Sequence, residues 1–305
     1  MKLIVTVPAY NETETLPKVI KSIPKKIKGI DEVKVLVWDD GSTDNTFESA
    51  KKAGADYVFK NKKNLGLAKT FNLATKKAVE LGADIVVNTD ADNQYDQAEI
   101  PKLIAPILEK GAEMVNGDRQ VSTLDHMPAS KKYGNIIGSW VIRQLTGVKL
   151  NDASSGFRAY TAETIKKFHI YSSHTYTHET IIQAAFGDVF IHEVPVTFKE
   201  RPGGSHNSRL ISSVWSHIKK SAATIIRTIL MYKSLKFFGI LGSVITALGF
   251  FGIFRFIYFY FQGSGNGHIQ SLVISSVLIS FGLTTLMVGV LADLISINRR
   301  LLEEK

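Results

Sequence analysis

The chain has 305 residues, of which 45% are hydrophobic and 21% charged, and it carries a formal net charge of +9 at pH 7. This length and balance exclude a disordered polypeptide and predict one or two folded domains. The absence of cysteine excludes disulfides and thiolate metal sites. The first residues lead directly into an apolar run without a signal-peptide pattern, so we expect the first half to stay on the side of the membrane where it is made.

The first half of the chain alternates short apolar, β-branched runs with helical patterns. Strands are predicted over residues 3–7, 33–38, 57–59, 85–88 and 114–116. This alternation is typical of an α/β domain with a mostly parallel sheet and helices on both faces. Ligands of such sheets bind beyond the carboxyl ends of the strands. The polar segments 8–12, 39–44 and 90–94 follow the first, second and fourth runs, so we expect a site there.

Two aspartates directly follow the fourth predicted strand. Asp90 and Asp92 are two residues apart and should point the same way, with Gln94 as a possible third oxygen ligand. Such a set suits Mg²⁺ or Mn²⁺, which would neutralise a departing diphosphate. Solvated turn residues are the alternative interpretation of this short pattern. In the same way, segment 39–44 is open to interpretation as a turn and helix cap.

Basic residues gather just before a strongly apolar region that begins near residue 237. They are Lys219, Lys220, Arg227, Lys233 and Lys236. This placement suits anionic lipid headgroups, although a solvated basic face is an alternative. Nucleic acid fits less well, because no DNA- or RNA-binding module is visible. We therefore expect membrane lipids as partners and no nucleic acid.

The second half predicts an attachment to a membrane. Apolar residues recur at helical spacing over 210–230, which favours an amphipathic helix lying in the membrane interface, with a helix packed on a soluble domain as the alternative. Residues 237–261 and 269–297 are each long enough to cross a bilayer. Basic residues flank this pair on one side only, which predicts that both termini and the first half of the chain are cytoplasmic. The expected divisions are 1–206, 207–234 and 235–305.

Several motifs, taken in order, resemble one enzyme family. They are PAYNE (8–12), DDGSTD (39–44), DAD (90–92), GDR (117–119), DASSGFR (152–158), EVP (193–195) and ERPGGS (200–205). Together with the two apolar spans, this set resembles the inverting glycosyltransferase family 2 with its GT-A fold. Within that family it is similar to the polyprenyl-phosphate branch, which includes dolichyl-phosphate mannose synthases.

The resemblance implies a role for particular residues. Those expected around the nucleotide are Pro8, Tyr10, Glu12, Asp39 and Asp90, and those expected to hold Mg²⁺ or Mn²⁺ are Asp90, Asp92 and Gln94. Arg119, Arg201 and Ser205 would meet donor or acceptor phosphates, and Asp92, Asp152 and Arg119 would be catalytic. His206 departs from the family, in which a lysine is frequent at this place, and would bind phosphate less firmly.

The expected reaction is transfer of a hexose from a nucleotide-sugar of the GDP-mannose or UDP-glucose type to polyprenyl or dolichyl phosphate. Asp152 or Glu179 could act as a base, but an ionised lipid phosphate needs none, and Asp152 could instead orient the acceptor or a neighbouring arginine. Alternatives are a transferase to another lipid or glycan, a processive polysaccharide synthase, for which a QxxRW segment is missing, and a non-catalytic binding module. An NAD-dependent enzyme is disfavoured without GxGxxG. A homo-oligomer is possible through close-packing points in the first span, Gly239, Gly242, Gly249 and Gly252.

Overall fold

The computed structural model describes residues 1–125, 127–171, 175–201, 223, 226, 230, 233–264 and 268–303, with side chains up to residue 298. The chain divides into two compact units, Met1–Thr224 and Ile225–Lys305. Most of the amphipathic helix expected over 210–230, together with Ser205 and His206, lies outside the described residues.

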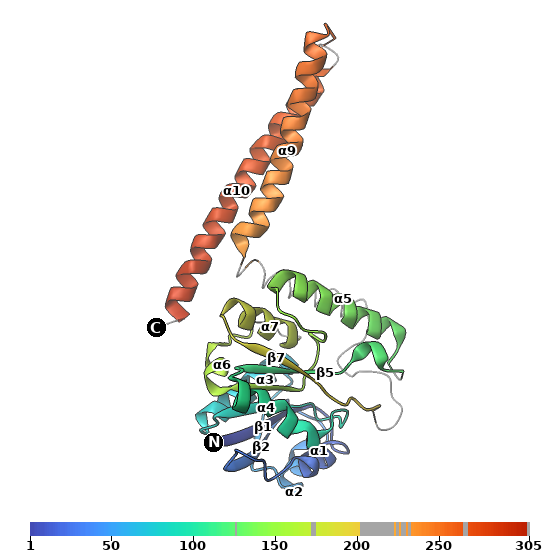
Figure 1. Ribbon diagram of the computed structural model, residues 1–305, viewed down its shortest axis with the longest axis vertical. Coiled ribbons are helices and arrows are strands. Elements are labelled where there is room, and N and C mark those ends of the chain that lie inside the picture. The colour runs from blue at the N-terminus through green and yellow to red at the C-terminus, as the bar shows by residue number, and fades with distance from the viewer. Residues whose placement is uncertain are drawn as a thin grey trace. The chain divides into compact units, whose positions relative to one another are not determined.

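The first unit is an α/β domain, shown in Figure 1. Its strands are β1 (Lys2–Ala9), β2 (Glu32–Asp39), β3 (Tyr57–Lys60), β4 (Ile85–Asn88), β5 (Met114–Asp118), β6 (Arg158–Thr161) and β7 (Ile191–Pro195). Its α-helices are α1 (Leu16–Ser22), α2 (Thr46–Lys52), α3 (Leu67–Glu80), α4 (Ile100–Lys110), α5 (Ala129–Thr146), α6 (Ala162–Lys167) and α7 (Thr177–Phe186), and short 3₁₀ turns are η1 (Gln97–Glu99) and η2 (Val121–Thr123).

The strands form one sheet in the order β3-β2-β1-β4-β6-β5-β7. All five strands predicted from the sequence are present, and the sheet is mostly parallel as expected. β6 and β7 were not predicted. β6 has the sequence Arg-Ala-Tyr-Thr, without valine, isoleucine or leucine, so it lacks the apolar, β-branched run by which the other strands were predicted.

β6 is the antiparallel strand of this sheet, and it lies between β4 and β5. Its first residue, Arg158, is level with Asn88 on β4 and with Asn116 on β5. The segment that precedes β6 therefore passes between the carboxyl ends of β4 and β5. This register brings the loop after Asp152 to the two places where DAD and GDR begin.

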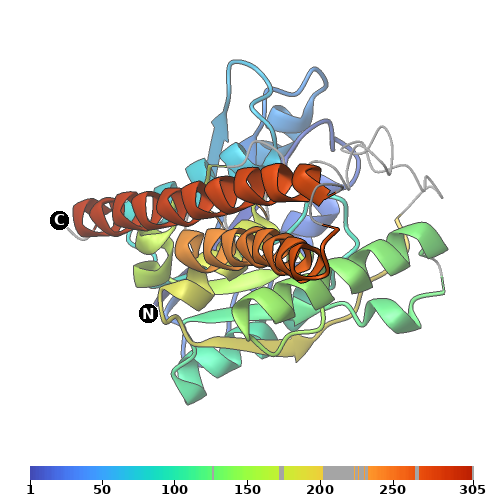
Figure 2. The same ribbon diagram turned by 90° about the horizontal axis from the view of Figure 1, so that it is seen from above.

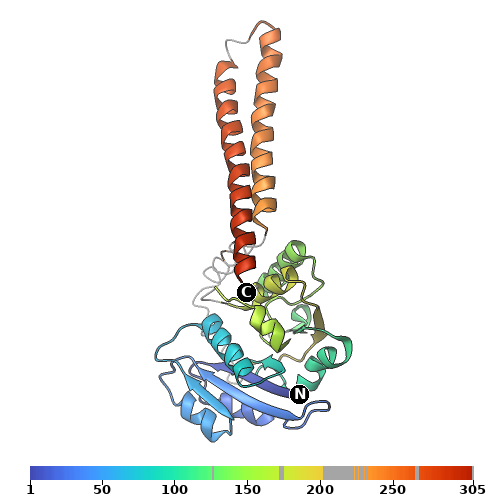
Figure 3. The ribbon, with the colours of Figure 1, turned by 90° about the vertical axis from the view of Figure 1, so that its left-hand side faces the viewer.

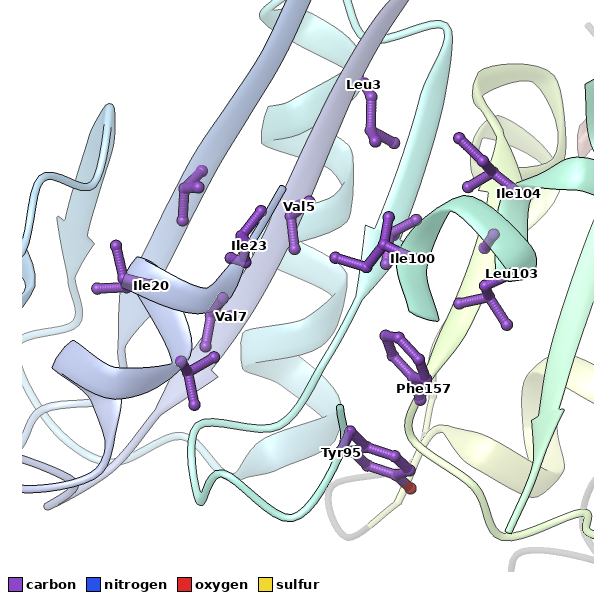
Figure 4. Packing of buried hydrophobic residues seen from close by; sticks show 14 of the residues in the cluster. Leu3, Val5, Val7, Ile20, Ile23, Tyr95, Ile100, Leu103, Ile104 and Phe157 are labelled. Carbon is purple, nitrogen blue, oxygen red and sulfur yellow. The ribbon is translucent and has the colours of Figure 1, made fainter. Parts of the chain in front are cut away.

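Successive side chains of β1 point to opposite faces of the sheet, and both faces are covered by helices. Leu3, Val5 and Val7 pack against α1 and α4, in the cluster that Figure 4 shows. The opposite face packs on α3, which contacts β1, β2 and β4 through buried residues such as Phe71. Burying the sheet between two helical layers leaves its strand ends, where backbone ladders stop, as the place for polar chemistry.

The second unit is a pair of long helices, α9 (Ser234–Phe261) and α10 (Ile269–Glu303), which lie side by side in Figures 2 and 3. Ser234–Phe261 and Ile269–Asn298 have a mean hydropathy of 2.1 and are long enough to cross a membrane. Only 11% and 17% of the residues in the most apolar 18-residue stretch of each helix are buried, so these apolar side chains mostly face outward. This distribution differs from that of the core helix of a soluble protein and suits contact with lipid.

Glycines bring the two helices close together. A Cβ on Gly242 would lie 2.8 Å from the carbonyl oxygen of Gly282, and one on Gly249 would lie 2.6 Å from Cγ1 of Ile279. These small residues therefore serve the contact between α9 and α10 within one chain. Gly239 has nothing within 4 Å of its Cβ position.

Candidate active site

The loops after β1 and β2 are joined by reciprocal hydrogen bonds. The backbone N–H of Asn11 donates to Ser42 Oγ (2.9 Å), and Asn11 Oδ1 accepts from the backbone N–H of Thr43 (2.9 Å). Asn11 has a positive φ of 54°, a conformation that asparagine tolerates better than most residues. The N–H of Glu12 donates to Thr46 Oγ1 at 2.9 Å. PAYNE and DDGSTD thus form one structural element.

The two adjacent aspartates at the end of β2 have different partners. Asp39 is fully buried, accepts from the N–H of Ser42 at 2.8 Å and lies 3.3 Å from the ammonium of Lys60. Asp40 accepts from the N–H groups of Leu65 (2.8 Å) and Gly66 (2.9 Å) and so holds the loop before α3. Asp39 lies at the carboxyl end of β2, and its contact with a nucleoside stays a prediction. The structural role of Asp40 was not predicted, although the aspartate doublet was visible.

Pro8 and Tyr10 lie at the end of β1, as the sequence predicts. Pro8 is buried and level with Trp38 on β2, and Tyr10 is half-buried just beyond the strand. Proline has no N–H to donate, and Pro8 lies beyond Thr6, the last β1 residue that is paired with β4. These two residues and Asp39 are therefore brought to the same end of the sheet.

Asp90 and Asp92 follow β4 in a tight turn, and Asn93 adopts a positive φ of 60°. Burial and the neighbouring charge of Asp92 raise the pKa of Asp90 to about 7. Burial also raises the pKa of Asp92, and the charge of Arg201 opposes this shift. Two neighbouring carboxylates repel each other when both are ionised, which raises their pKa values. A bound divalent cation would offset this repulsion.

Gly156 makes room for the Asp90 carboxylate. A Cβ at this position would lie 2.8 Å from Oδ1 and 3.0 Å from Oδ2 of Asp90. The N–H of Gly156 donates to the hydroxyl of Tyr95 at 3.0 Å, and its carbonyl accepts from Asn88 Nδ2 at 2.9 Å. The glycine of DASSGFR is thus needed because the loop before β6 passes directly behind Asp90.

Gln94 joins the DAD turn to the segment after β7. Its side-chain Nε2 donates to the carbonyl of Lys199 (3.1 Å), and its backbone carbonyl accepts from the N–H of Lys199 (2.7 Å). The side-chain oxygen of Gln94 is the atom that a metal would use. Among the described residues, no group of three or more His, Cys, Asp or Glu side chains is placed to hold a metal ion. Asp90 and Asp92 would supply two carboxylate ligands and Gln94 a third oxygen, and Mg²⁺ commonly takes its remaining ligands from substrate and water.

Arg119 and Asp152 form a buried ion pair. Arg119 Nε donates to Asp152 Oδ2 (2.6 Å), and Nη2 donates to Oδ1 (2.9 Å). Burial by itself would raise the pKa of the Asp152 carboxyl, but the charge and hydrogen bonds of Arg119 hold this pKa below its ordinary value. Burial disfavours the charged guanidinium, whereas Asp152 raises the pKa of Arg119. Asp152 therefore stays ionised and holds Arg119, and it is poorly suited to take up a proton.

A second set of contacts holds the backbone of Asp152. Its N–H donates to Glu193 Oε1 (3.2 Å), and its carbonyl accepts from Asn116 Nδ2 (2.8 Å). Asn116 also donates to Glu193 Oε1 at 2.9 Å. EVP and the strand before GDR thus fix the loop that carries Asp152. Asn116 was not predicted as part of the site, because its partners are remote in the sequence.

Arg201 pairs with Glu12 in a partly buried contact that joins the segment after β7 to the loop after β1. Glu12 also accepts from Thr15 Oγ1 at 2.7 Å. The charge of Glu12 raises the pKa values of both Asp90 and Asp92, and the charges of Arg119 and Arg201 act on Asp90 and Asp92 respectively. Four segments remote in the sequence therefore meet at one charged cluster.

Glu179 lies in a different environment. It is buried on α7, and its Oε1 accepts from the backbone N–H of Tyr171 at 3.0 Å. His178 on the same helix lies 3.2 Å from Ser154 Oγ. Through His178, α7 contacts the loop before β6, and through Glu179 it holds the segment that follows α6.

Known proteins resemble this chain in sequence and in fold. Residues 4–168 match the family described as glycosyl transferase family 2. A UDP-N-acetylglucosamine–dolichyl-phosphate N-acetylglucosaminyltransferase of Methanococcus voltae is 32% identical over 178 residues, covering 52% of this chain and 69% of that protein. An undecaprenyl-phosphate mannosyltransferase of Micrococcus luteus is 30% identical over 215 residues, covering 67% of this chain and 86% of that protein.

The fold is that of solved glycosyltransferases. The crystal structure of glucosyl-3-phosphoglycerate synthase from Mycobacterium tuberculosis, in complex with Mn²⁺, uridine diphosphate and glucosyl-3-phosphoglycerate, has a TM-score of 0.59 and 20% identity. The match covers 74% of this chain and 79% of that one. The GT-A fold and the resemblance to relatives that act on polyprenyl phosphates are therefore confirmed. The chain belongs to glycosyltransferase family 2 and is a glycosyltransferase.

Proposed function

We propose that this protein transfers a sugar from a nucleoside diphosphate sugar to a polyprenyl phosphate of the dolichyl type. The observation that carries the proposal is the charged cluster in which the guanidinium charges of Arg119 and Arg201 act on the carboxylates of Asp90 and Asp92. Carboxylates suit a metal-bound diphosphate, and guanidinium groups suit phosphate oxygens. Relatives named for transfer to dolichyl and undecaprenyl phosphate support a lipid phosphate as acceptor.

The donor would lie across the loops after β1 and β2. Asp39, Tyr10 and Pro8 would surround the nucleoside, and Glu12 would hold Arg201 beside the diphosphate. The joined loops give this side of the site a fixed shape, because Ser42 Oγ accepts from the backbone N–H of Asn11 and Asn11 Oδ1 accepts from the backbone N–H of Thr43. A fixed shape lowers the entropic cost of binding a nucleotide.

Asp90 and Asp92 would hold Mg²⁺ or Mn²⁺, with Gln94 as a third ligand. The raised pKa of Asp90 supports this role, because two crowded carboxylates favour a bound cation over a shared proton. When bound, the ion supplies positive charge to the departing diphosphate. Asp92 is the residue whose loss should stop the reaction.

In the proposed reaction, an oxygen of the lipid phosphate forms a bond to the anomeric carbon while the bond from that carbon to the diphosphate breaks. The nucleoside diphosphate leaves with the electron pair. Attack from the opposite face inverts the anomeric configuration. A phosphate monoester with a second pKa of about 6 is already ionised at neutral pH and needs no base. Asp152 then acts by orienting Arg119, which would contact a phosphate.

We further propose that α9 and α10 span the membrane and that the catalytic unit is cytoplasmic. Lys233 and Lys236 precede α9 or lie in its first turn, and Arg299 and Arg300 lie near the end of α10, whereas residues 262–268 carry no lysine or arginine. An excess of positive charge marks the cytoplasmic side of membrane spans. The donor would be a cytoplasmic nucleotide-sugar.

The experiment is transfer from a panel of radiolabelled UDP- and GDP-sugars to polyprenyl phosphate in detergent, with Mg²⁺ or Mn²⁺ and with chelator. Glucose, mannose and N-acetylglucosamine donors belong in the panel. Label that enters the lipid phase from one donor, and is lost with chelator, is the expected result. Polymer or free sugar without labelled lipid would overturn the proposed acceptor and favour a synthase or another acceptor.

Matched variants distinguish the site from general damage. Asp92→Ala should abolish lipid labelling without loss of folding. Asp31→Ala is the control, because Asp31 is exposed and pairs with the chain's amino terminus. Full activity of Asp92→Ala in the presence of metal would contradict the metal assignment.

A further inference from the structure

The segment after β7 is bound to the turn that carries the candidate metal ligands. The backbone N–H of Lys199 donates to the carbonyl of Gln94 (2.7 Å), and its ammonium donates to Asp96 Oδ2 (3.0 Å). Phe198, the residue before it, forms an isolated antiparallel bridge with Tyr95, and the two rings meet edge to face with their centroids 5.1 Å apart. Both the backbone and the ring of Phe198 are therefore fixed against this turn.

The ring of Phe198 also contacts Arg119. The central carbon of the guanidinium lies 5.2 Å from the ring centroid, which is within the range of a cation–π interaction. The hydrogen bonds from Arg119 to Asp152 leave from Nε and Nη2. A carboxylate and an aromatic ring thus hold the same guanidinium. The side chain of Arg119 is only 10% exposed, and a cation–π interaction is stronger where the cation is shielded from water.

The pair with Asp152 does not use Nη1 of Arg119, so this nitrogen is the one that we expect to donate to a phosphate oxygen. Its position depends on how the guanidinium is held. Hydrogen bonds at one edge fix the guanidinium within its plane, whereas a ring that attracts the charge restrains the rotation that two hydrogen bonds still permit. Phe198 is placed to supply this second restraint.

We propose that Phe198 is a positioning residue for sugar transfer, whose ring holds the guanidinium of Arg119 for a phosphate oxygen and connects it to the metal-binding turn. The contact of Arg119 with phosphate rests on the proposed function, whereas the contact between ring and guanidinium does not. Two neighbouring residues thereby hold one group from each half of the site, since Lys199 binds Gln94 and Phe198 binds Arg119. A displacement of the turn would displace the guanidinium as well.

Fluorinated phenylalanines test the proposal with little change in the shape of the ring. Each added fluorine weakens the negative potential on the ring face that attracts a cation. The full chain is made with 4-fluoro-, 3,5-difluoro- or 3,4,5-trifluorophenylalanine at position 198 alone. The control is the same series at Phe168, a buried ring that meets Tyr160 edge to face. In the described part of the chain, no lysine or arginine lies over the Phe168 ring.

kcat/KM for sugar transfer should fall stepwise with the number of fluorines at position 198, by about threefold or more with three fluorines, and should stay level in the series at position 168. A residue that only fills space would not respond to the charge distribution of its ring. A level series at position 198, or a loss there that does not follow the number of fluorines, would overturn the proposal. If the labelled sugar enters another acceptor, the series is measured on that reaction, so a wrong acceptor is recognised separately.

Unfolding measures the contact without any sugar transfer. Phe198→Leu is compared in the unsubstituted chain and in a chain with Arg119→Gln and Asp152→Asn, which contains no unpaired buried carboxylate at this place. The denaturation midpoint should fall less in the second chain, because the cation that the ring attracts is already gone. Equal falls in both chains would show that the ring and the guanidinium do not interact and would also overturn the proposal.

Discussion

Arg119 and Asp152 are joined by two parallel hydrogen bonds, from Nε to Oδ2 at 2.6 Å and from Nη2 to Oδ1 at 2.9 Å. The side chains are only 10% and 1% exposed, so each charge depends on the other for compensation. Removing one partner of a buried pair leaves an uncompensated charge, whereas removing both is much less costly.

Asp152→Asn should therefore lower the free energy of unfolding by about 3 kcal/mol or more. The double variant Arg119→Gln with Asp152→Asn should recover most of this stability and remain inactive, because the guanidinium needed for phosphate is missing. Chemical denaturation and the transfer assay measure the two effects. A double variant with substantial activity would show that Arg119 serves the fold alone.

The raised pKa of Asp90 predicts how stability depends on pH. A carboxyl that binds its proton more tightly in the folded protein contributes stability that is fully present below its ordinary pKa and is lost as pH rises through about 7. The metal-free protein should thus show a lower Tm at pH 8 than at pH 5.5. The difference will be smaller than full burial would imply, because Asp90 keeps some exposure to solvent.

Divalent cations should reverse this loss. Mn²⁺ should raise Tm clearly at pH 8 and little at pH 5.5, where protons compete for the carboxylates. Asp90→Asn should flatten the pH dependence and remove the response to Mn²⁺. The pKa of Asp152 is shifted downward, so its opposite contribution is lost only as pH falls below the ordinary carboxyl range. If Asp90→Asn showed the same Mn²⁺ response as the unsubstituted protein, the assignment of Asp90 as a metal ligand would be contradicted.

Gly156 should not accept a side chain. In Gly156→Ala, the new Cβ would lie 2.8 Å from Asp90 Oδ1, so the carboxylate or the loop must shift, at a cost of about 1–3 kcal/mol. We expect a raised Mn²⁺ requirement in the transfer assay. Gly134→Ala is the control, since nothing lies within 4 Å of its Cβ position. Equal metal requirements of the two variants would refute the contact as a constraint.

The glycines of α9 should differ according to their contacts with α10. Gly249→Ala places a Cβ 2.6 Å from Ile279 Cγ1 and should destabilise the helix pair, whereas Gly239→Ala meets nothing within 4 Å and should be neutral or slightly stabilising. Resistance to proteolysis in lipid vesicles compares the two. A destabilised Gly239→Ala with an unaffected Gly249→Ala would indicate that α9 uses its glycines to contact another molecule.

The sequence alone determined the elements whose signal is local. The five apolar, β-branched runs became β1 to β5, and the two long apolar segments became α9 and α10, because burial in a sheet or exposure to lipid selects side chains over a continuous stretch. The order of PAYNE, DDGSTD and DAD after three strands was enough to identify the family, since parallel strands end at one edge of a sheet.

Only the tertiary structure decided what depends on contacts between remote residues. The antiparallel insertion of β6 joins Arg158 to Asn88 and Asn116, and this register places Gly156 behind Asp90. The same folding turns Asp152 from a candidate base into the anion that holds Arg119. β6 has no apolar, β-branched run that would mark it in the sequence, and the protonation state of a buried carboxylate is set by its partner, so local sequence could not choose between the possible roles of Asp152.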